Sequence, residues 1–532
     1  RGADCLNHLN GMFAFAIWDR ETQSLFLARD PFGIKPLYYH NDGKQLLFAS
    51  EVKAILAALG RHAEIDVQAL DDYVTFQYAL DGKTLFKGVS KLLPGFWMRI
   101  GRSGRIETGR YWKPSFVDRG VKEQEATEML RCLLEDSVRL RTRGDTPIGF
   151  HLSGGIDSAS IAGLAAPLMD NPLKTFTAGF RDGEGFDDTG FAALSAEFFG
   201  TRHLETFPTH HDFERDFTHL IRHLDEPVAA PGAFAQFAVA RLAAPHVKVV
   251  LGGQGADELI GGYARYYLAA VTAAVKADAR GESLSGLPLS NLLENLGQLK
   301  AYRPLIAEVW PQGISDSPAD LYLRLIRRGE CVRRTLHADV WSGLSGYGAE
   351  HRYREVFCKL EGLDLLNRIL HYETTASLPA LLQVEDRVSM AWSLEARLPF
   401  LDVRIAELMF SLPANIKFKD GRLKSILRGA MKDVVPAQIL GRSNKVGFPV
   451  PLKAWFDGPL RDWVRDLLLG ERTRQRGLFS QTEVCRMLDG EGAFDRGVWG
   501  LVCLETWFRL WVDGEGLAAP APRHMVPEVG AA

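Results

Sequence analysis

Apolar residues fall into short runs in the first 115 residues of this chain, and turn-forming or polar residues separate these runs. Such spacing is typical of strands joined by tight turns. A helix should follow from Glu51 to Leu59, and residues 66–78 read as a second helix. We expect strands over residues 12–18, 25–28, 37–39 and 46–49. The first part of the chain is therefore predicted to be a β-rich unit.

After residue 145 the pattern changes to strands that alternate with helices. An amphipathic helix over residues 123–142 precedes this region, with Leu130, Leu134 and Val138 on one face. Strands are expected over residues 147–152, 174–180, 202–206 and 247–251, with helices at 157–168, 187–199, 211–224 and 234–244. This alternation predicts an α/β fold with a doubly wound parallel sheet, whose ligands bind beyond the carboxyl ends of the strands.

The first candidate site directly follows the strand at 147–152. A turn of small residues there exposes the free N–H groups of a helix N-terminus, which attract an anion. Gly154 and Gly155 allow close backbone approach, and Ser153 and Ser158 add hydroxyl donors. Asp157 would repel a phosphate, so we expect it to hold Mg²⁺ that bridges to the phosphates. The alternative is an ordinary glycine-rich turn between a strand and a helix.

A second glycine-rich turn, Leu251-Gly252-Gly253-Gln254-Gly255-Ala256-Asp257-Glu258, follows the strand at 247–251. Asp257 and Glu258 either cap the next helix or face a magnesium nucleotide. Because both turns leave parallel strands at their carboxyl ends, they should lie on the same rim of the sheet.

Charged residues further along the chain supply the remaining candidates. Glu385, Arg387, Glu395 and Arg397 have a spacing that would also suit surface ion pairs on a helix. Two cations, Lys424 at a helix start and Lys445 in a loop rich in glycine and proline, follow them. Lone lysines are usually solvated, but a loop of this kind can bring a cation to leaving pyrophosphate.

Composition narrows the class of protein. The 532 residues suffice for several domains, and a net charge of −3 gives no basic field for nucleic acid. The six cysteines show no metal-binding spacing, which suits free thiols in a reducing compartment. No apolar run is long enough to span a bilayer and no signal peptide is visible, so we expect a cytoplasmic protein without membrane partners.

Several strings resemble known families. The Ser153–Ser158 turn looks like the pyrophosphate loop of ATP pyrophosphatases, which cleave ATP to AMP and pyrophosphate. "GMFAFAIWD", "ARDPFGIKPLYY" and "FASEVKAI" look like the second half of a class II glutamine amidotransferase domain. "DRVSMAWSLEARLPFLD" is similar to a signature of the synthetase domain that such enzymes carry. From Gly2 to Trp507 the chain resembles the glutamine-hydrolysing asparagine synthetases.

The resemblance implies a partial N-terminal-nucleophile αββα domain over residues 1–115 and an ATP pyrophosphatase (HUP-like) synthetase domain over 116–512, followed by a flexible tail at 513–532. It implies amidation of aspartate through a β-aspartyl-AMP intermediate, with ATP and Mg²⁺ and with nitrogen from glutamine or ammonia. Asp386 and Arg387 would line the acyl-acceptor site, and Lys445 would be the main electrostatic catalyst. ATP and pyrophosphate would contact Ser153, Gly154, Gly155, Asp157, Ser158, Gly252, Gly253, Asp257 and Lys424, with the metal on Asp157 and Asp257.

The chain departs from the family in three places. Gln254 stands where several members carry a glutamate that assists amide formation, so the role would pass to Glu258 or Asp386. Ala230 stands where relatives often have aspartate in the acceptor pocket. The family's terminal cysteine nucleophile is absent and Cys5 does not replace it, so we expect a fragment of a complete enzyme or an ammonia-dependent form.

These departures leave alternatives open. One is a related adenylating amidotransferase that acts on another carboxylate, as β-lactam-forming or cell-surface-amidating relatives do. Another is a regulatory protein that only binds nucleotide. Residues 264–360 are predicted to be a helical scaffold, and a homodimer is compatible with the family although the sequence does not determine the oligomeric state.

Overall fold

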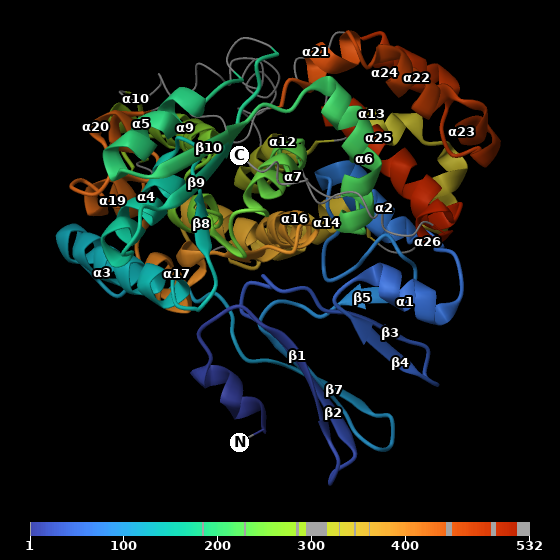
Figure 1. Ribbon diagram of the computed structural model, residues 1–532, viewed down its shortest axis with the longest axis horizontal. Coiled ribbons are helices and arrows are strands. Elements are labelled where there is room, and N and C mark those ends of the chain that lie inside the picture. Colours follow the sequence, from blue (N-terminus) through green and yellow to red (C-terminus); the bar gives the residue numbers. More distant parts are fainter. Residues whose placement is uncertain are drawn as a thin grey trace, which may run out of the picture.

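The computed structural model describes residues 2–182, 186–227, 230–282, 287–293, 317–328, 330–344, 347–360, 362–442, 450–490 and 496–518. Figure 1 shows a small N-terminal unit beneath a larger one that contains the parallel sheet. Among the described residues, no helix combines the length and the apolar character needed to cross a membrane.

Two antiparallel sheets form the N-terminal unit, which was predicted to be β-rich. One has the order β1-β2-β6-β7 and the other the order β4-β3-β5. The strands are β1 (Ala14–Asp19), β2 (Ser24–Arg29), β3 (Tyr38–Asn41), β4 (Leu46–Ala49), β5 (Val89–Lys91), β6 (Phe96–Ile100) and β7 (Ile106–Arg110). The helices are α1 (Val52–Leu59) and α2 (Val67–Phe76). Asp66 caps α2 by accepting a hydrogen bond from the Ala69 N–H at 2.9 Å.

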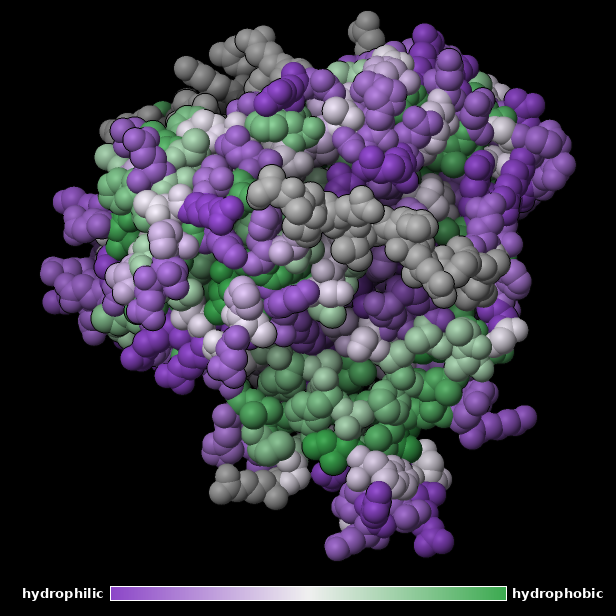
Figure 2. Space-filling view, viewed as in Figure 1, coloured by the Kyte–Doolittle hydropathy of each residue, from purple (hydrophilic) through white to green (hydrophobic). Residues whose placement is uncertain are grey.

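Apolar surface gathers over this N-terminal unit in the space-filling view (Figure 2). Ile17 and Trp18 on β1 are both 54% exposed, and Phe48 on β4 is 41% exposed. Ile17 and Trp18 are adjacent on β1 and point to opposite faces of the sheet, so neither face is covered at this edge strand.

The larger unit holds a five-stranded sheet in the order β10-β9-β8-β11-β12, with parallel neighbours throughout. Its strands are β8 (Ile148–His151), β9 (Lys174–Ala178), β10 (Arg202–Thr206), β11 (Val249–Leu251) and β12 (Glu395–Arg397). Helices α3 (Glu123–Arg141), α4 (Ile156–Ala165) and α5 (Thr189–Phe199) pack together on one face. Helices α6 (His210–Leu224), α7 (Gly232–Ala243) and α16 (Leu378–Met390) pack together on the other. This confirms the doubly wound parallel sheet.

Strand β12 corrects one expectation. Glu395 and Arg397 lie on a strand that pairs with β11, whereas their spacing suggested a helix. A three-residue edge strand with two charged side chains carries no apolar alternation that a sequence pattern would show. Its stability comes from distant partners, since Arg397 donates to the Arg141 and Arg143 carbonyls at 2.9 and 2.7 Å. The resemblance also implied that Glu395 and Arg397 are structural, and these contacts are compatible with that prediction.

Helices make up the described parts of the segment expected to be scaffold. These are α9 (Ala264–Ala279), α10 (Leu289–Leu293), α12 (Pro318–Ile326), α13 (Glu330–Thr335) and α14 (Ala349–Cys358). Helix α15 (Leu365–Tyr372) packs on α9. Later helices include α17 (Val403–Phe410), α19 (Ser425–Ala430), α20 (Ala437–Gly441), α21 (Leu452–Asp457), α22 (Arg461–Leu469), α24 (Gln481–Leu488) and α25 (Arg496–Trp507).

One hydrophobic core joins the two units, because α25 packs against the N-terminal unit. The ring of Phe86 lies 5.0 Å from that of Trp507 and 6.0 Å from that of Trp511. Of the predicted flexible tail, residues Glu515–Ala518 form the short helix α26, and residues 519–532 lie outside the described ranges.

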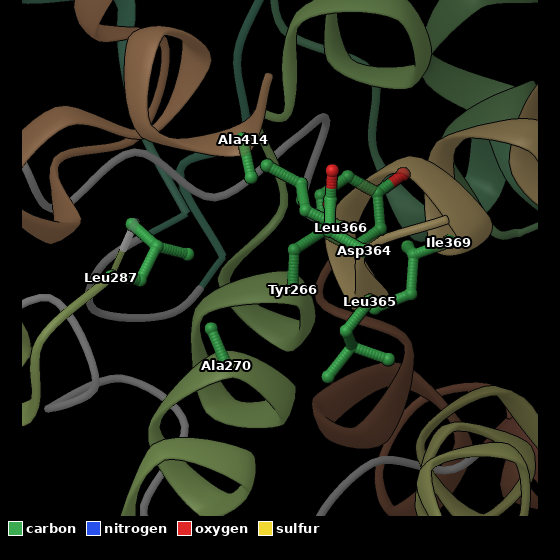
Figure 3. A pocket seen from close by; sticks show the side chains of 8 residues that line it. All are labelled: Tyr266, Ala270, Leu287, Asp364, Leu365, Leu366, Ile369 and Ala414. Atoms are coloured by element: carbon green, nitrogen blue, oxygen red, sulfur yellow. The ribbon is translucent and has the colours of Figure 1, made fainter. Parts of the chain in front are cut away.

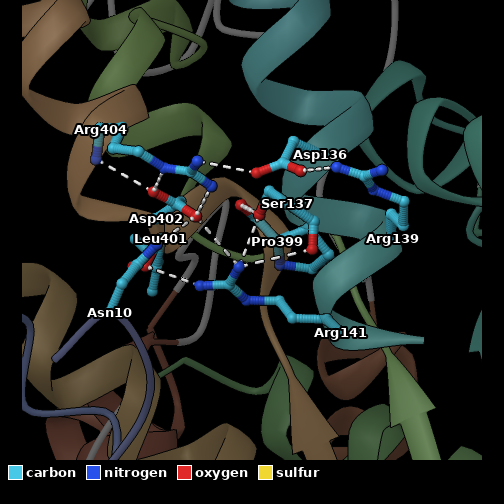
Figure 4. Close-up of polar contacts among 9 residues, drawn as sticks. All are labelled: Asn10, Asp136, Ser137, Arg139, Arg141, Pro399, Leu401, Asp402 and Arg404. Carbon is cyan, nitrogen blue, oxygen red and sulfur yellow. Dashed lines mark hydrogen bonds and ion pairs between the residues drawn. The ribbon is translucent and has the colours of Figure 1, made fainter. Parts of the chain in front are cut away.

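A buried charge cluster fixes the end of the "PFLD" string onto α3 (Figure 4). Asp402 is fully buried and caps α17 through the Arg404 N–H at 3.0 Å. Its carboxylate also pairs with Arg141 at 3.3 Å and accepts from Asn10 of the N-terminal unit at 3.0 Å. Burial alone would raise the pKa of Asp402, but hydrogen bonds from Arg404 and Asn10 and the charge of Arg141 lower it.

Candidate functional site

The two glycine-rich turns meet at the point where the strand order of the sheet reverses. From β8 the chain continues to β9 and β10 on one side, whereas β11 and β12 lie on the other. Such a switch point opens a crevice beyond the strand ends, where α/β proteins bind ligands. The turn after β8 leads into α4, and the turn after β11 leads into α8 (Ala256–Ile260). The predicted common rim is thus confirmed.

Close packing explains why glycine occupies both turns. Gly154 has a left-handed φ of +68°, and a Cβ there would lie 2.7 Å from the Cβ of Phe191. A Cβ on Gly253 would lie 2.7 Å from the Cβ of Asp157, so the two turns touch one another. Ser158 closes the first turn, because its Oγ lies 3.1 Å from the Ser153 N–H that donates to it.

Lys424 joins the two predicted aspartates. Its Nζ lies 2.6 Å from Oδ2 of Asp157 and 2.5 Å from Oδ1 of Asp257. Burial would lower the pKa of Lys424, but the two carboxylates outweigh it and raise the pKa. Gly262 is required beside this cluster, since a Cβ there would lie 1.8 Å from Oδ1 of Asp257. The structure therefore brings together the predicted phosphate-binding residues of both turns and one of the two predicted lysines.

Lys445 falls outside the described residues, which stop at Arg442 and resume at residue 450. The residue that leads into this segment is anchored on the first turn. Arg442 donates to the Gly154 carbonyl at 3.0 Å, pairs with Asp188, and lies 3.9 Å from the ring centroid of Phe191. No pattern in the sequence indicated Arg442, because its partners lie more than 250 residues away.

Glu258 lies buried on α8 directly after Asp257. The Tyr263 hydroxyl donates to its Oε1 at 2.5 Å. Burial, and next the charge of Asp257, raise the pKa of Glu258 to about 7. Its predicted catalytic role stays a prediction, since this carboxylate is already held by a neighbouring side chain.

Helix α16 carries Asp386 and Arg387 to the boundary with the N-terminal unit. Asp386 pairs with Lys35 of that unit at 3.0 Å. Arg387 donates to the Ser50 carbonyl and pairs with Glu51 at 3.2 Å. Both residues therefore contact the N-terminal unit, and their predicted contact with the acyl acceptor stays a prediction.

Glu385 is a candidate proton acceptor, although its spacing in the sequence suggested only a surface ion pair. Its Oε1 lies 3.8 Å from Nδ1 of His151, the last residue of β8. A Cβ on Gly252, the first residue after β11, would lie 3.7 Å from the same oxygen. Glu385 thus faces the ends of both central strands. Burial, and next the charge of Asp386, raise the pKa of Glu385 to about 7, and burial lowers the pKa of His151 to about 4.

The donor set at the two turns fits Mg²⁺. This ion prefers carboxylate and phosphate oxygens, and it usually takes only one or two carboxylates from the protein. Asp157 and Asp257 provide two carboxylates that converge on one cation, Lys424. Among the described residues, no group of three or more histidine, cysteine or acidic side chains is arranged to hold a metal by itself. The remaining ligands would therefore come from the nucleotide and water.

Two hollows elsewhere do not compete with this site. A cavity of about 70 Å³ lies between α9 and α15, with Tyr266, Leu366 and Ile369 on its walls (Figure 3). It is too small for a nucleotide. A polar cleft of about 500 Å³ lies between α2 and α14, but Arg333 and Arg354 on its walls already pair with carboxylates.

Comparisons with known proteins agree with this geometry. The asparagine synthase family model matches residues 129–509, and the glutamine amidotransferase domain matches residues 1–112. A putative glutamine-hydrolysing asparagine synthetase of Mycobacterium tuberculosis is 35% identical over 96% of this chain and 78% of its own length. Asparagine synthetase 1 of Bacillus subtilis is 30% identical over 96% of this chain and 79% of its own. A protein named Amidase chyE, from Penicillium rubens, is 29% identical over 90% of this chain and 75% of its own. With the two turns, the sheet that presents them and both domain matches in agreement, this chain belongs to the asparagine synthase family.

Proposed function

We propose that this chain activates the side-chain carboxylate of aspartate with ATP and then transfers ammonia to it, giving asparagine, AMP and pyrophosphate. The observation that carries this proposal is the convergence of Asp157 and Asp257 on Lys424 at the switch point of the sheet. In this arrangement two separate turns bring carboxylates to one small region beside a cation, where they could hold the Mg²⁺ that accompanies a triphosphate.

The chemistry explains why activation comes first. A carboxylate does not accept an amine, because it is anionic and would have to expel oxide. In the proposed first step, a carboxylate oxygen of aspartate attacks the α-phosphorus of ATP, and the bond to the β-phosphate breaks. Lys424, Lys445 and the N–H groups at the start of α4 would stabilise the departing pyrophosphate. Mg²⁺ held by Asp157 and Asp257 would neutralise further phosphate charge.

In the second step ammonia attacks the activated carbonyl carbon, AMP leaves, and the nitrogen loses a proton. Gln254 has no basic group that could take this proton. Tyr263 holds Glu258 and Lys35 holds Asp386, whereas Glu385 faces the ends of β8 and β11. We assign the proton to Glu385, because a carboxylate with a pKa of about 7 is suited to a general base at neutral pH.

A second candidate function keeps adenylation but takes another carboxylic acid. Gln254 and Ala230 differ from what we expect of an aspartate-specific member. The likeness to a relative named as an amidase favours the same alternative.

Pyrophosphate release from ATP, Mg²⁺ and ammonium chloride tests the proposal across a panel of amino acids and other carboxylic acids. We expect release with aspartate, in equal amounts with AMP and asparagine. Activity with another acid and none with aspartate would establish the second candidate. If no acid yields AMP, the chain only binds nucleotide. An Asp157→Asn variant is the control, because it should lose release with every acid.

A further inference from the structure

Among the ion pairs that cross the boundary between the two units, three share one arrangement. In each pair a lysine of the N-terminal unit meets a carboxylate of the larger unit that is less than 10% exposed. The pairs are Lys35–Asp386 at 3.0 Å, Lys53–Asp225 at 2.9 Å and Lys91–Glu226 at 2.5 Å. In these three pairs the positive charge lies on the N-terminal unit, whereas Arg387 of the larger unit pairs in the opposite sense with Glu51. Lys35 differs from the other two because its partner lies on α16, next to the residue that faces the nucleotide turns.

The loop that carries Lys35 is held rigid by two buried charges. The Arg29 guanidinium donates to three backbone carbonyls, including that of Lys35 at 2.8 Å. The Asp30 carboxylate accepts from three backbone N–H groups of the same loop, including that of Lys35 at 2.9 Å. Charge-assisted bonds of this kind fix the backbone on both sides of the side chain. Lys35 thus contacts Asp386 from a fixed position, although the two residues are 351 apart in sequence.

Asp386 in turn has a specific place on α16. Its predecessor, Glu385, lies 3.8 Å from His151 at the end of β8. Its successor, Arg387, contacts Ser50 and Glu51 of the N-terminal unit. Movement of Asp386 would therefore displace Glu385, a carboxylate that faces the ends of both central strands.

We propose that Lys35 is a positioning residue of the synthetase site, supplied by the amidotransferase unit: it neutralises and orients Asp386, so that this side of α16 can receive the anionic acid substrate. The inference rests on the proposed function, since it takes α16 as the side of the site that receives the acid. Without Lys35, Asp386 is a buried anion without that cation, and an anionic substrate meets uncompensated negative charge. The nucleotide turns, which Lys35 does not contact, keep their geometry.

The test uses the full chain with ammonium as the nitrogen donor, so that glutamine hydrolysis does not enter. For Lys35→Met we expect the KM for the acid to rise at least tenfold, while the KM for ATP stays within twofold of wild type. Lys35→Arg keeps the charge and should recover much of the loss. Adding Asp386→Asn to Lys35→Met removes the uncompensated anion, and this double variant should show a lower KM for the acid than Lys35→Met alone.

Lys53→Met is the matched control, because it removes an ion pair of 2.9 Å from the same boundary, compared with 3.0 Å for Lys35. The side chains of the two lysines are also buried to about the same extent. A similar rise in the KM for the acid in Lys53→Met would show that loosening of the boundary is sufficient, and would overturn the proposal. An unchanged KM in Lys35→Met, with an active wild type, would overturn it as well. A wild type that forms no AMP with any acid would instead refute the proposed function itself.

Discussion

Replacement of Lys424 by methionine probes the centre of the phosphate site. The Nζ of Lys424 separates two carboxylate oxygens, one at 2.6 Å on Asp157 and one at 2.5 Å on Asp257. These oxygens are therefore at most about 5 Å apart, and two unit charges at that distance repel by about 3 kcal/mol at an effective dielectric constant of about 20. Asp257 is 31% exposed at its side chain, so solvent screening reduces the expected loss of stability to about 1–3 kcal/mol.

Thermal unfolding with and without Mg²⁺ measures this effect. Without Mg²⁺ we expect the apparent Tm of Lys424→Met to fall by a few degrees. Addition of Mg²⁺ should recover most of this loss, since a divalent cation can then lie between the two carboxylates. In the absence of nucleotide the wild type should respond much less, because its own ammonium group then occupies that position. Pyrophosphate release should fall about a hundredfold, the usual effect of losing a group that stabilises a developing anion.

A lysine close in sequence provides the control. Lys419 pairs with Glu123 at 2.8 Å, but both side chains are about half exposed, so Lys419→Met should change neither the Tm nor its response to Mg²⁺. Equal stabilisation by Mg²⁺ in the wild type and in Lys424→Met would refute the reasoning. So would a Lys424→Met protein as stable as the wild type in the absence of Mg²⁺.

Three further changes test other parts of the molecule. In the wild type the rate of asparagine formation should rise with pH through about 7, where Glu385 loses its proton. Glu385→Gln should abolish this rise and lower kcat by about 10²–10⁴-fold, and a pH–rate profile of both proteins measures the two effects. Asp402→Asn should lower the free energy of unfolding by about 3 kcal/mol at pH 7. Because the pKa of Asp402 is lowered on folding, its carboxylate stabilises the fold above about pH 4, and this stabilisation is lost as the pH falls through the folded-state pKa. In denaturant titrations at several pH values, the free energy of unfolding of the variant should therefore fall less steeply toward acid pH than that of the wild type. Gly154→Ala places a side chain at a left-handed φ, so it should lower the free energy of unfolding by about 1–3 kcal/mol and weaken ATP binding. In Gly190→Ala the new Cβ meets nothing within 4 Å, so calorimetric titrations with ATP should show unchanged affinity for this control.

The parts of the molecule that the sequence predicted well are those whose signal is local. The turns at Gly154 and Gly253 each lie between a strand and a helix within about ten residues, although the side chains that leave room only for glycine there, Phe191 and Asp157, come from other parts of the chain. The alternation of apolar strands and amphipathic helices likewise determined the doubly wound sheet. The helical spacing suggested for Glu395 and Arg397 was wrong, because three residues with two charges carry no periodicity, and only pairing with β11 makes them a strand.

The electrostatic partners could not be predicted, because they are distant in sequence. Lys424 and Asp157 are 267 residues apart, and Arg442 and Gly154 are 288 apart. No pattern in the chain indicates that a lysine at a helix start bridges two aspartates, or that Lys35 reaches α16. Such pairings depend on how the sheet, α16 and the N-terminal unit pack, because only that packing brings the two partners together.

The same distinction bears on the substitution at Gln254. At the level of the turn alone, Gln254 leaves the proton transfer without a base, and the sequence suggested Glu258 or Asp386 as its acidic replacement. In the fold, each of these has a partner that already uses its charge: the Tyr263 hydroxyl for one and the Lys35 ammonium for the other. Glu385 lies instead against the ends of the two strands that bear the nucleotide turns, in a buried setting that keeps its pKa near neutrality. A site with several carboxylates can therefore lose one base from a turn, provided that another helix brings a carboxylate of suitable pKa to the same rim.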